Sequence, residues 1–98
     1  MVITILQAQV APDQWKTLER VYQQAITELD RGIEQTFLLH GFADATLWQI
    51  VTVWQSREAL DEMRRSGETP RGVLMFRAAG AEPVLSVFDV AAHASVSG

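Results

Sequence analysis

Apolar residues follow two kinds of spacing along the chain, and each kind predicts a type of element. β-forming residues that partly alternate with polar ones predict strands, and the stretches of this kind are 2–10, 33–40, 46–55 and 83–90. Apolar residues three and four apart predict a helix that Pro12 opens and Gly32 caps. A second helix should follow its N-cap residue Ser56 and end at Gly67, and a short helix is expected over 71–79.

The order of these elements predicts the fold class. Strand, helix, strand, strand, helix, strand is the order of two interlocked split βαβ units. The turn residues of GFADA, 41–45, join the second and third strands as a hairpin. We therefore expect an α+β, ferredoxin-like fold, with a four-stranded antiparallel sheet and helices on one of its faces.

The third strand, within LWQIVTVWQS at 47–56, is apolar on both faces. Its two sets of side chains are Leu47, Val51 and Val53 on one face and Trp48, Ile50 and Trp54 on the other. Helices on one face cover only one set, and an exposed apolar patch of this size is typical of an interface. We expect one set in the core under the helices and the other in a homodimer contact between sheet faces.

The composition and charge of the chain limit the classes of partner that it can bind. The chain has 98 residues, of which 48% are hydrophobic, a net charge of −4 and no cysteine. We expect one domain over 1–98, with 91–98 a flexible or partner-contacting tail. Without a basic run, nucleic acid and membrane surfaces are poor partners. Without cysteine, thiol catalysis and disulfides are excluded. Residues 1–10 lack the basic start of a signal peptide and the apolar runs are too short to span a membrane, so a cytoplasmic location is the default expectation.

The stretch VTVWQSREALDEMRRSG, 51–67, resembles the strand-to-helix junction of the antibiotic biosynthesis monooxygenase (ABM) family. The resemblance extends over residues 2 to about 90 and implies a homodimeric α/β barrel with a pocket between helices and sheet. The haem-degrading branch of this superfamily uses asparagine, tryptophan and histidine. Here the chain has no asparagine, and Met63 and Val73 occupy the corresponding tryptophan and histidine positions. We therefore expect no cofactor.

Candidate site residues come from the side chains able to hold and activate a planar molecule. As catalytic groups we consider His40 as base, with Tyr22 or Arg71 stabilising an oxyanion. The alternative for His40 is a partly solvated strand-end histidine bonded to a loop carbonyl. The substrate-binding candidates are Trp15, Trp54, Met63 and Phe76, and these could equally be core residues. Two histidines more than fifty positions apart give no metal signal.

Two functions remain open from the sequence. The first is a small cofactor-independent monooxygenase of the ABM type, acting on a planar aromatic or quinone-forming substrate. The second is a non-catalytic ligand-binding or stress-response dimer with the same pocket. In either case we expect the rings of Trp15, Tyr22 and Trp54 to converge on one cavity under the helices.

Overall fold

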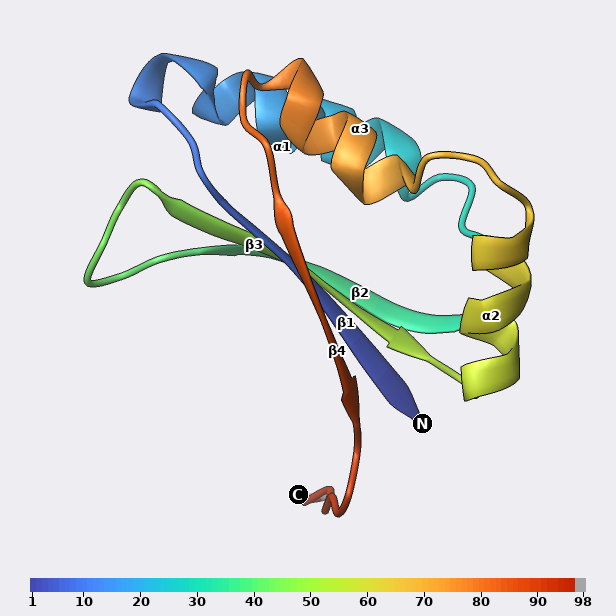
Figure 1. Cartoon of the computed structure of the whole chain (residues 1–98). Coiled ribbons are helices and arrows are strands. Elements are labelled where there is room, and N and C mark those ends of the chain that lie inside the picture. The colour runs from blue at the N-terminus through green and yellow to red at the C-terminus, as the bar shows by residue number, and fades with distance from the viewer. Residues whose placement is uncertain (97–98) are drawn as a thin grey trace.

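The computed structural model describes residues 1–96 and shows four strands and three α-helices (Figure 1). A short 3-10 helix at Pro12–Gln14 precedes α1. The strands are β1 (Val2–Gln9), β2 (Ile33–His40), β3 (Leu47–Trp54) and β4 (Val84–Asp89). The helices are α1 (Trp15–Ala25), α2 (Arg57–Arg65) and α3 (Arg71–Ala78). The strands pair in the order β2-β3-β1-β4, and every pair is antiparallel.

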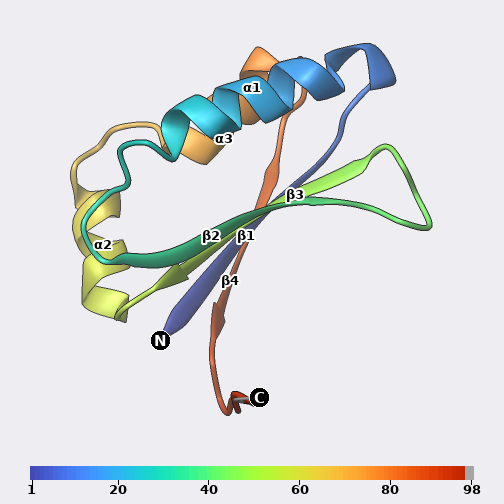
Figure 2. The same cartoon turned by 180° about the vertical axis from the view of Figure 1, so that it is seen from behind.

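All three helices lie on one side of the sheet, as Figures 1 and 2 show from opposite directions. The expected α+β, ferredoxin-like plan is confirmed. The hairpin of β2 and β3 forms as expected, with a register irregularity between Ile33 and Gln35. Ser56 caps α2, because its side-chain oxygen accepts a hydrogen bond of 3.1 Å from the backbone N–H of Ala59.

The first helix ends earlier than the sequence predicts. It stops at Ala25, and the chain reaches β2 through turns over 26–32. The side chain of Thr27 donates a hydrogen bond of 2.7 Å to the carbonyl of Gln24, which a continuing helix would use for its own backbone. Gly32 has the expected positive φ of 88°, but it lies in the turn just before β2, well beyond the end of α1, and does not cap that helix.

The register settles which set of third-strand residues the helices cover. Trp48, Ile50 and Trp54 are buried and belong to the cores on the helix side. The main core cluster contains Leu18 and Phe76, both without exposed surface. A smaller cluster at the other end of β3 joins Val2, Trp54 and Leu60.

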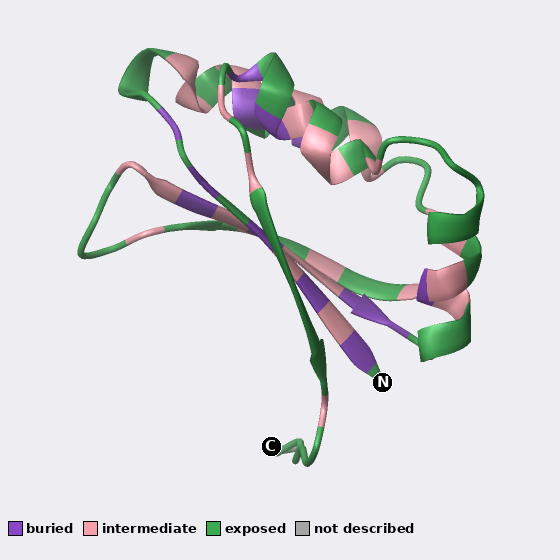
Figure 3. Cartoon of the chain, in the orientation of Figure 1, coloured by how far each residue is buried: buried purple, intermediate pink, exposed green. Residues whose placement is uncertain are grey.

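The opposite face of the sheet is uncovered and largely apolar. Its odd-numbered β1 residues Ile3 and Ile5 pair with valines of β3, and Ile3 also pairs with Phe88 of β4. Phe37 on β2 is 45% exposed and Phe88 on β4 is 51% exposed. The edge strand β4 is exposed along its whole length (Figure 3). The two-sided pattern of the third strand therefore reflects one packed face and one open face.

Residues 91–96 of the expected tail form no helix or strand and are exposed. Residues 97–98, also part of that expectation, lie outside the described residues. No helix within 1–96 is long and apolar enough to cross a membrane.

Candidate functional site

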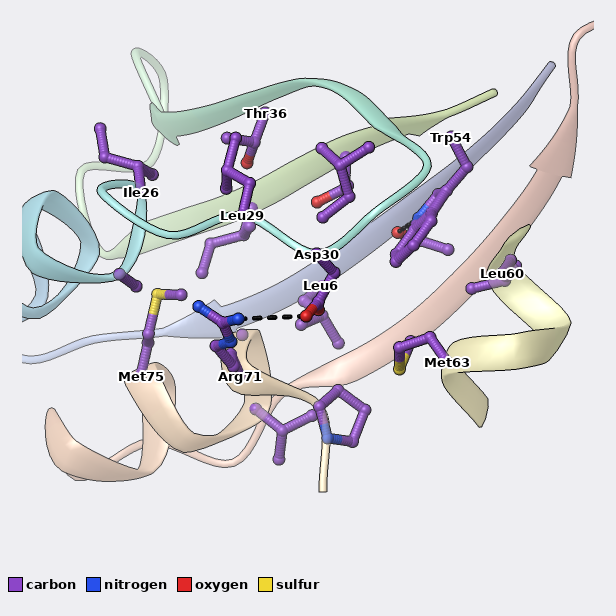
Figure 4. Close-up of a pocket in the computed structure, with 18 of the residues that line it drawn as sticks. Leu6, Ile26, Leu29, Asp30, Thr36, Trp54, Leu60, Met63, Arg71 and Met75 are labelled. Carbon is purple, nitrogen blue, oxygen red and sulfur yellow. Dashed lines mark hydrogen bonds and ion pairs between the residues drawn. The ribbon is translucent and has the colours of Figure 1, made fainter. Parts of the chain in front are cut away.

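A cavity of about 120 Å³ lies between the sheet and its helical cover, at the end of the sheet near α2 (Figure 4). Leu6, Thr36 and Trp54 contribute to its floor from three different strands. Ile26 and Leu29 line it from the segment that follows α1. The early end of α1 therefore matters, because the residues that a longer helix would have carried form a cavity wall instead.

Four of the sequence-predicted site residues line this cavity: Tyr22, Trp54, Met63 and Arg71. Tyr22 is 7% exposed, and its hydroxyl donates a hydrogen bond of 3.3 Å to the hydroxyl of Thr36. The indole N–H of Trp54 donates a hydrogen bond of 3.1 Å to the hydroxyl of Thr4. Both rings are therefore held in place by threonines of the floor.

The other three predicted residues lie elsewhere. Phe76 is fully buried in the main core and does not line the cavity. The ring of Trp15 lies 4.6 Å from that of His40 in an edge-on arrangement, and its N–H donates to the carbonyl of Val10. The expected convergence of three aromatic rings thus holds for Tyr22 and Trp54 but not for Trp15.

His40 lies at the end of β2 in an aromatic cluster. Its ring stacks on Trp48, with centroids 4.0 Å apart and planes inclined by 12°. Its Nε2 is 2.6 Å from the carbonyl oxygen of Ala45, which can only accept, so Nε2 carries the proton. This is the loop-carbonyl contact considered from the sequence. His40 lines a shallow groove beside α1, which also borders Tyr22 and Trp48.

Three threonines of the cavity floor form a row that sequence reasoning did not identify. Thr36, Thr52 and Thr4 are directly opposite one another on β2, β3 and β1, and all three line the cavity. Each occupies a polar position in an apolar stretch, which is a visible signal. These single threonines do not indicate a common site until the strand register is known, because only the register places the three positions side by side.

Charged groups occupy the cavity margin. The guanidinium of Arg71 lies 3.0 Å from the carboxylate of Asp30 and also donates to the carbonyl of Glu28. Figure 4 shows this pair joining the start of α3 to the segment before β2. Both side chains are half-exposed, so the pair contributes little to stability. The pair does fix the position of a cation and a carboxylate at the cavity margin. Asp30, like the three threonines, lines the cavity and was not identified from the sequence.

The described residues form no cluster of metal-ligating side chains. No group of three or more histidine, cysteine, aspartate or glutamate side chains is arranged to hold a metal ion within 1–96.

The family model for antibiotic biosynthesis monooxygenase matches residues 1–73, and the chain belongs to this family. Among proteins with curated functions no match was found. A solved structure of SnoaB from Streptomyces nogalater, described as a cofactor-independent oxygenase, is 17% identical, with 94% of each chain covered and a TM-score of 0.69. Rv0793 from Mycobacterium tuberculosis is 23% identical, covering 96% of this chain and 98% of its own, with a TM-score of 0.69.

A third similar structure is a variant of MhuD with two manganese protoporphyrin IX molecules bound per active site. It is 18% identical, covers 98% of this chain and 100% of its own, and has a TM-score of 0.73. At these identities the likeness shows the fold alone.

A porphyrin does not fit the cavity described above. Sites for drug-sized ligands occupy about 300 Å³ or more, and a porphyrin is larger still, whereas this cavity has about 120 Å³. The lining residues include no histidine to act as an axial ligand. The chain also has no asparagine, the residue that the haem-degrading branch uses. The donor set and the volume both disagree with a haem site.

Proposed function

We propose that this protein is a small cofactor-independent monooxygenase whose cavity holds a planar aromatic or quinone-forming substrate. The observation that carries the proposal is the cavity itself: mostly apolar walls, with a tyrosine and a row of threonines as polar anchors, in a chain of the ABM family. Ligand sites are commonly apolar pockets with a few such fixed polar groups. The volume of about 120 Å³ is somewhat below the about 150 Å³ of an apolar cavity that binds benzene, which limits the proposed substrate to a single ring.

The proposed reaction converts a phenol to a quinone. The substrate anion reacts with O₂, one oxygen atom enters the ring, and the other leaves as water. The protein contributes a site that excludes water and groups that stabilise negative charge on the substrate oxygen. The guanidinium of Arg71 is one proposed group. The hydroxyl of Tyr22 is the other, and it would turn its single proton from Thr36 to the substrate oxygen. Asp30, beside Arg71, is placed to accept the phenolic proton.

The role of His40 as a base stays a prediction. Its position gives it no contact with a molecule in the cavity, because it lines the separate groove beside α1. Tyr22 borders both spaces and is the residue through which His40 could influence a bound substrate.

The alternative is a ligand-binding or stress-response protein that uses the same cavity without catalysis. Two observations favour it: the chain has no asparagine, and no imidazole lines the cavity. The two proposals share binding and differ in turnover.

The test is oxygen consumption with single-ring phenols and hydroquinones under ¹⁸O₂. The monooxygenase proposal predicts enzyme-dependent uptake and one labelled atom in a quinone product. Arg71→Gln should lower the rate, whereas Arg57→Gln, an exposed arginine of α2 outside the cavity, should leave it unchanged. Saturable binding without uptake would establish the non-catalytic alternative.

We also propose that the open face of the sheet forms a homodimer. An apolar face of this kind is typical of an interface rather than of a solvated surface. The residues that carry it are Ile3, Ile5, Phe37, Leu39, Val51 and Phe88. A dimer contact on this face would cover the apolar residues of the third strand that face away from the helices. The cytoplasmic location expected from the sequence stays a prediction.

Sedimentation equilibrium tests the dimer. At micromolar concentration the mass should be about twice the 10.9 kDa of one chain. Phe37→Glu should shift the protein to monomer, because it places a charge inside the apolar face. Phe42→Glu is the matched control, since Phe42 is fully exposed in the loop outside the sheet. A monodisperse monomer in the unmodified protein would refute the proposal.

A further inference from the structure

A row of three threonines crosses the floor of the cavity. Thr52 lies opposite Thr4 on one side and Thr36 on the other, so three hydroxyl-bearing side chains cross the sheet on neighbouring strands. Directly opposed residues have Cβ atoms about 4.5–5.5 Å apart. The row therefore places three hydroxyls within reach of one small molecule.

The two outer threonines accept hydrogen bonds from aromatic side chains of the cavity. The hydroxyl of Tyr22 donates to Thr36, and the indole of Trp54 donates to Thr4. A threonine hydroxyl has one proton to donate in addition to its acceptor lone pairs. For these two residues, no acceptor within 1–96 takes that proton.

Thr52, in the middle, makes no side-chain hydrogen bond to any described residue, although it is partly buried. The neighbouring floor positions Leu6 and Ile50 are apolar. A valine would fit the strand equally well in shape and β-propensity. The Thr52 hydroxyl is not cut off from solvent, so it is open to the cavity, where water or a ligand can bond to it.

We infer that this threonine row selects ligands that carry a hydrogen-bond acceptor oxygen on the ring, with Thr52 as the specificity-determining residue. The inference rests on the proposed function, because it takes the cavity to be the ligand site. The cations and carboxylates of the margin are balanced, since Arg64 and Arg71 accompany Glu28 and Asp30. The row therefore suits the carbonyl oxygen of a neutral ring, which is the product side of a phenol oxidation.

Two probes of nearly equal shape test this inference. Acetophenone has a carbonyl oxygen where ethylbenzene has two hydrogens, so the pair isolates the acceptor. Titrations followed by ¹H–¹⁵N NMR on the full chain give both affinities and show that each variant is folded. The unmodified protein should bind acetophenone several-fold tighter than ethylbenzene, up to about tenfold, as expected for one neutral hydrogen bond.

Three variants locate the effect. Thr52→Val should remove the preference for acetophenone while leaving ethylbenzene bound as tightly as before or more so. Thr52→Ser keeps the hydroxyl and should keep the preference. Thr17→Val, a partly buried threonine of α1 outside the cavity, should change neither affinity.

The failures of the inference and of the proposed function are distinguishable. Equal binding of both probes to the unmodified protein, or an equal loss of both in Thr52→Val, would overturn the role of the threonine row and leave the cavity as a ligand site. If neither probe binds the unmodified protein, the cavity is not a ligand site, and both proposals fall.

Discussion

The two ends of the helix-covered face of the sheet differ in how they are filled. At the closed end, α1 lies over the sheet, and the rings of Trp15, His40 and Trp48 pack on one another. At the cavity end, Trp54 makes no such ring contact and donates to Thr4 beside open space. The difference follows from the length of α1. Beyond Ala25 the chain covers the sheet with turns, which fill space less completely than a packed helix.

The largest expected effect is on stability at the closed end. Phe76→Ala should lower the free energy of unfolding by about 3–5 kcal/mol, because it leaves a hole in close-packed surroundings. Met63→Ala, on the wall of the cavity, should cost only about 1 kcal/mol, since Met63 is already partly exposed. Urea unfolding measures both. Equal losses would mean that the cavity end is as tightly packed as the closed end.

A smaller loss of stability is expected from a substitution at Gly32, where the cavity end meets α2. Gly32 has a φ of 88°, and an added Cβ would lie 2.5 Å from the Cβ of Ala59. Gly32→Ala should therefore cost about 2 kcal/mol or more, from backbone strain and the clash together. Gly67→Ala is the control, because its φ is also positive at 75° but nothing lies within 4 Å of the added atom. A larger loss in Gly67→Ala than in Gly32→Ala would contradict the close contact with α2.

His40→Ala should affect stability, which depends on the closed end, without affecting ligand affinity, which depends on the cavity end. Loss of its ring contacts should lower stability by on the order of 1 kcal/mol. Acetophenone affinity should not change, because His40 does not line the cavity. Thermal unfolding and the NMR titration measure the two quantities on the same sample. A loss of affinity without a loss of stability would place a ligand in the groove beside His40.

The smallest expected effect concerns pH and the hairpin loop at the closed end. Hydrogen bonds from the side chain and the backbone N–H of Thr46 lower the pKa of Asp44. A lowered folded-state pKa contributes stability that is complete above the ordinary value near 3.9 and is lost as pH falls through the folded-state value. Asp44→Ala should therefore flatten the acid limb of the stability profile slightly. An unchanged acid limb would show that these bonds do not persist in solution.

The fold could be predicted from the sequence because its signals are local. Strand alternation, the Ser56 cap and the turn around Asp44 each depend on neighbouring residues, and all three occur in the structure. The end of α1 was mispredicted because the apolar spacing continues through Ile26 and Leu29, although these residues leave the helix and line the cavity.

The site was predicted only in part because it depends on register and on three-dimensional packing. Tyr22 and Trp54 were identified by their ring type, and they do line the cavity. Trp15 and Phe76 have the same chemistry but pack in the closed end. The alignment of Thr4 with Thr52, and the contact of Asp30 with Arg71, join residues about forty or more positions apart. Neither could be derived from spacing along one chain.

The most direct test of the central claim uses the indole N–H signals of the three tryptophans. Trp54 reports on the cavity end, and Trp15 and Trp48 report on the closed end. On titration with phenol, the Trp54 signal should shift saturably, at one ligand per chain, while the other two stay in place. Shifts of Trp15 and Trp48 with an unmoved Trp54 would contradict it, because the ligand would then occupy the groove and not the cavity.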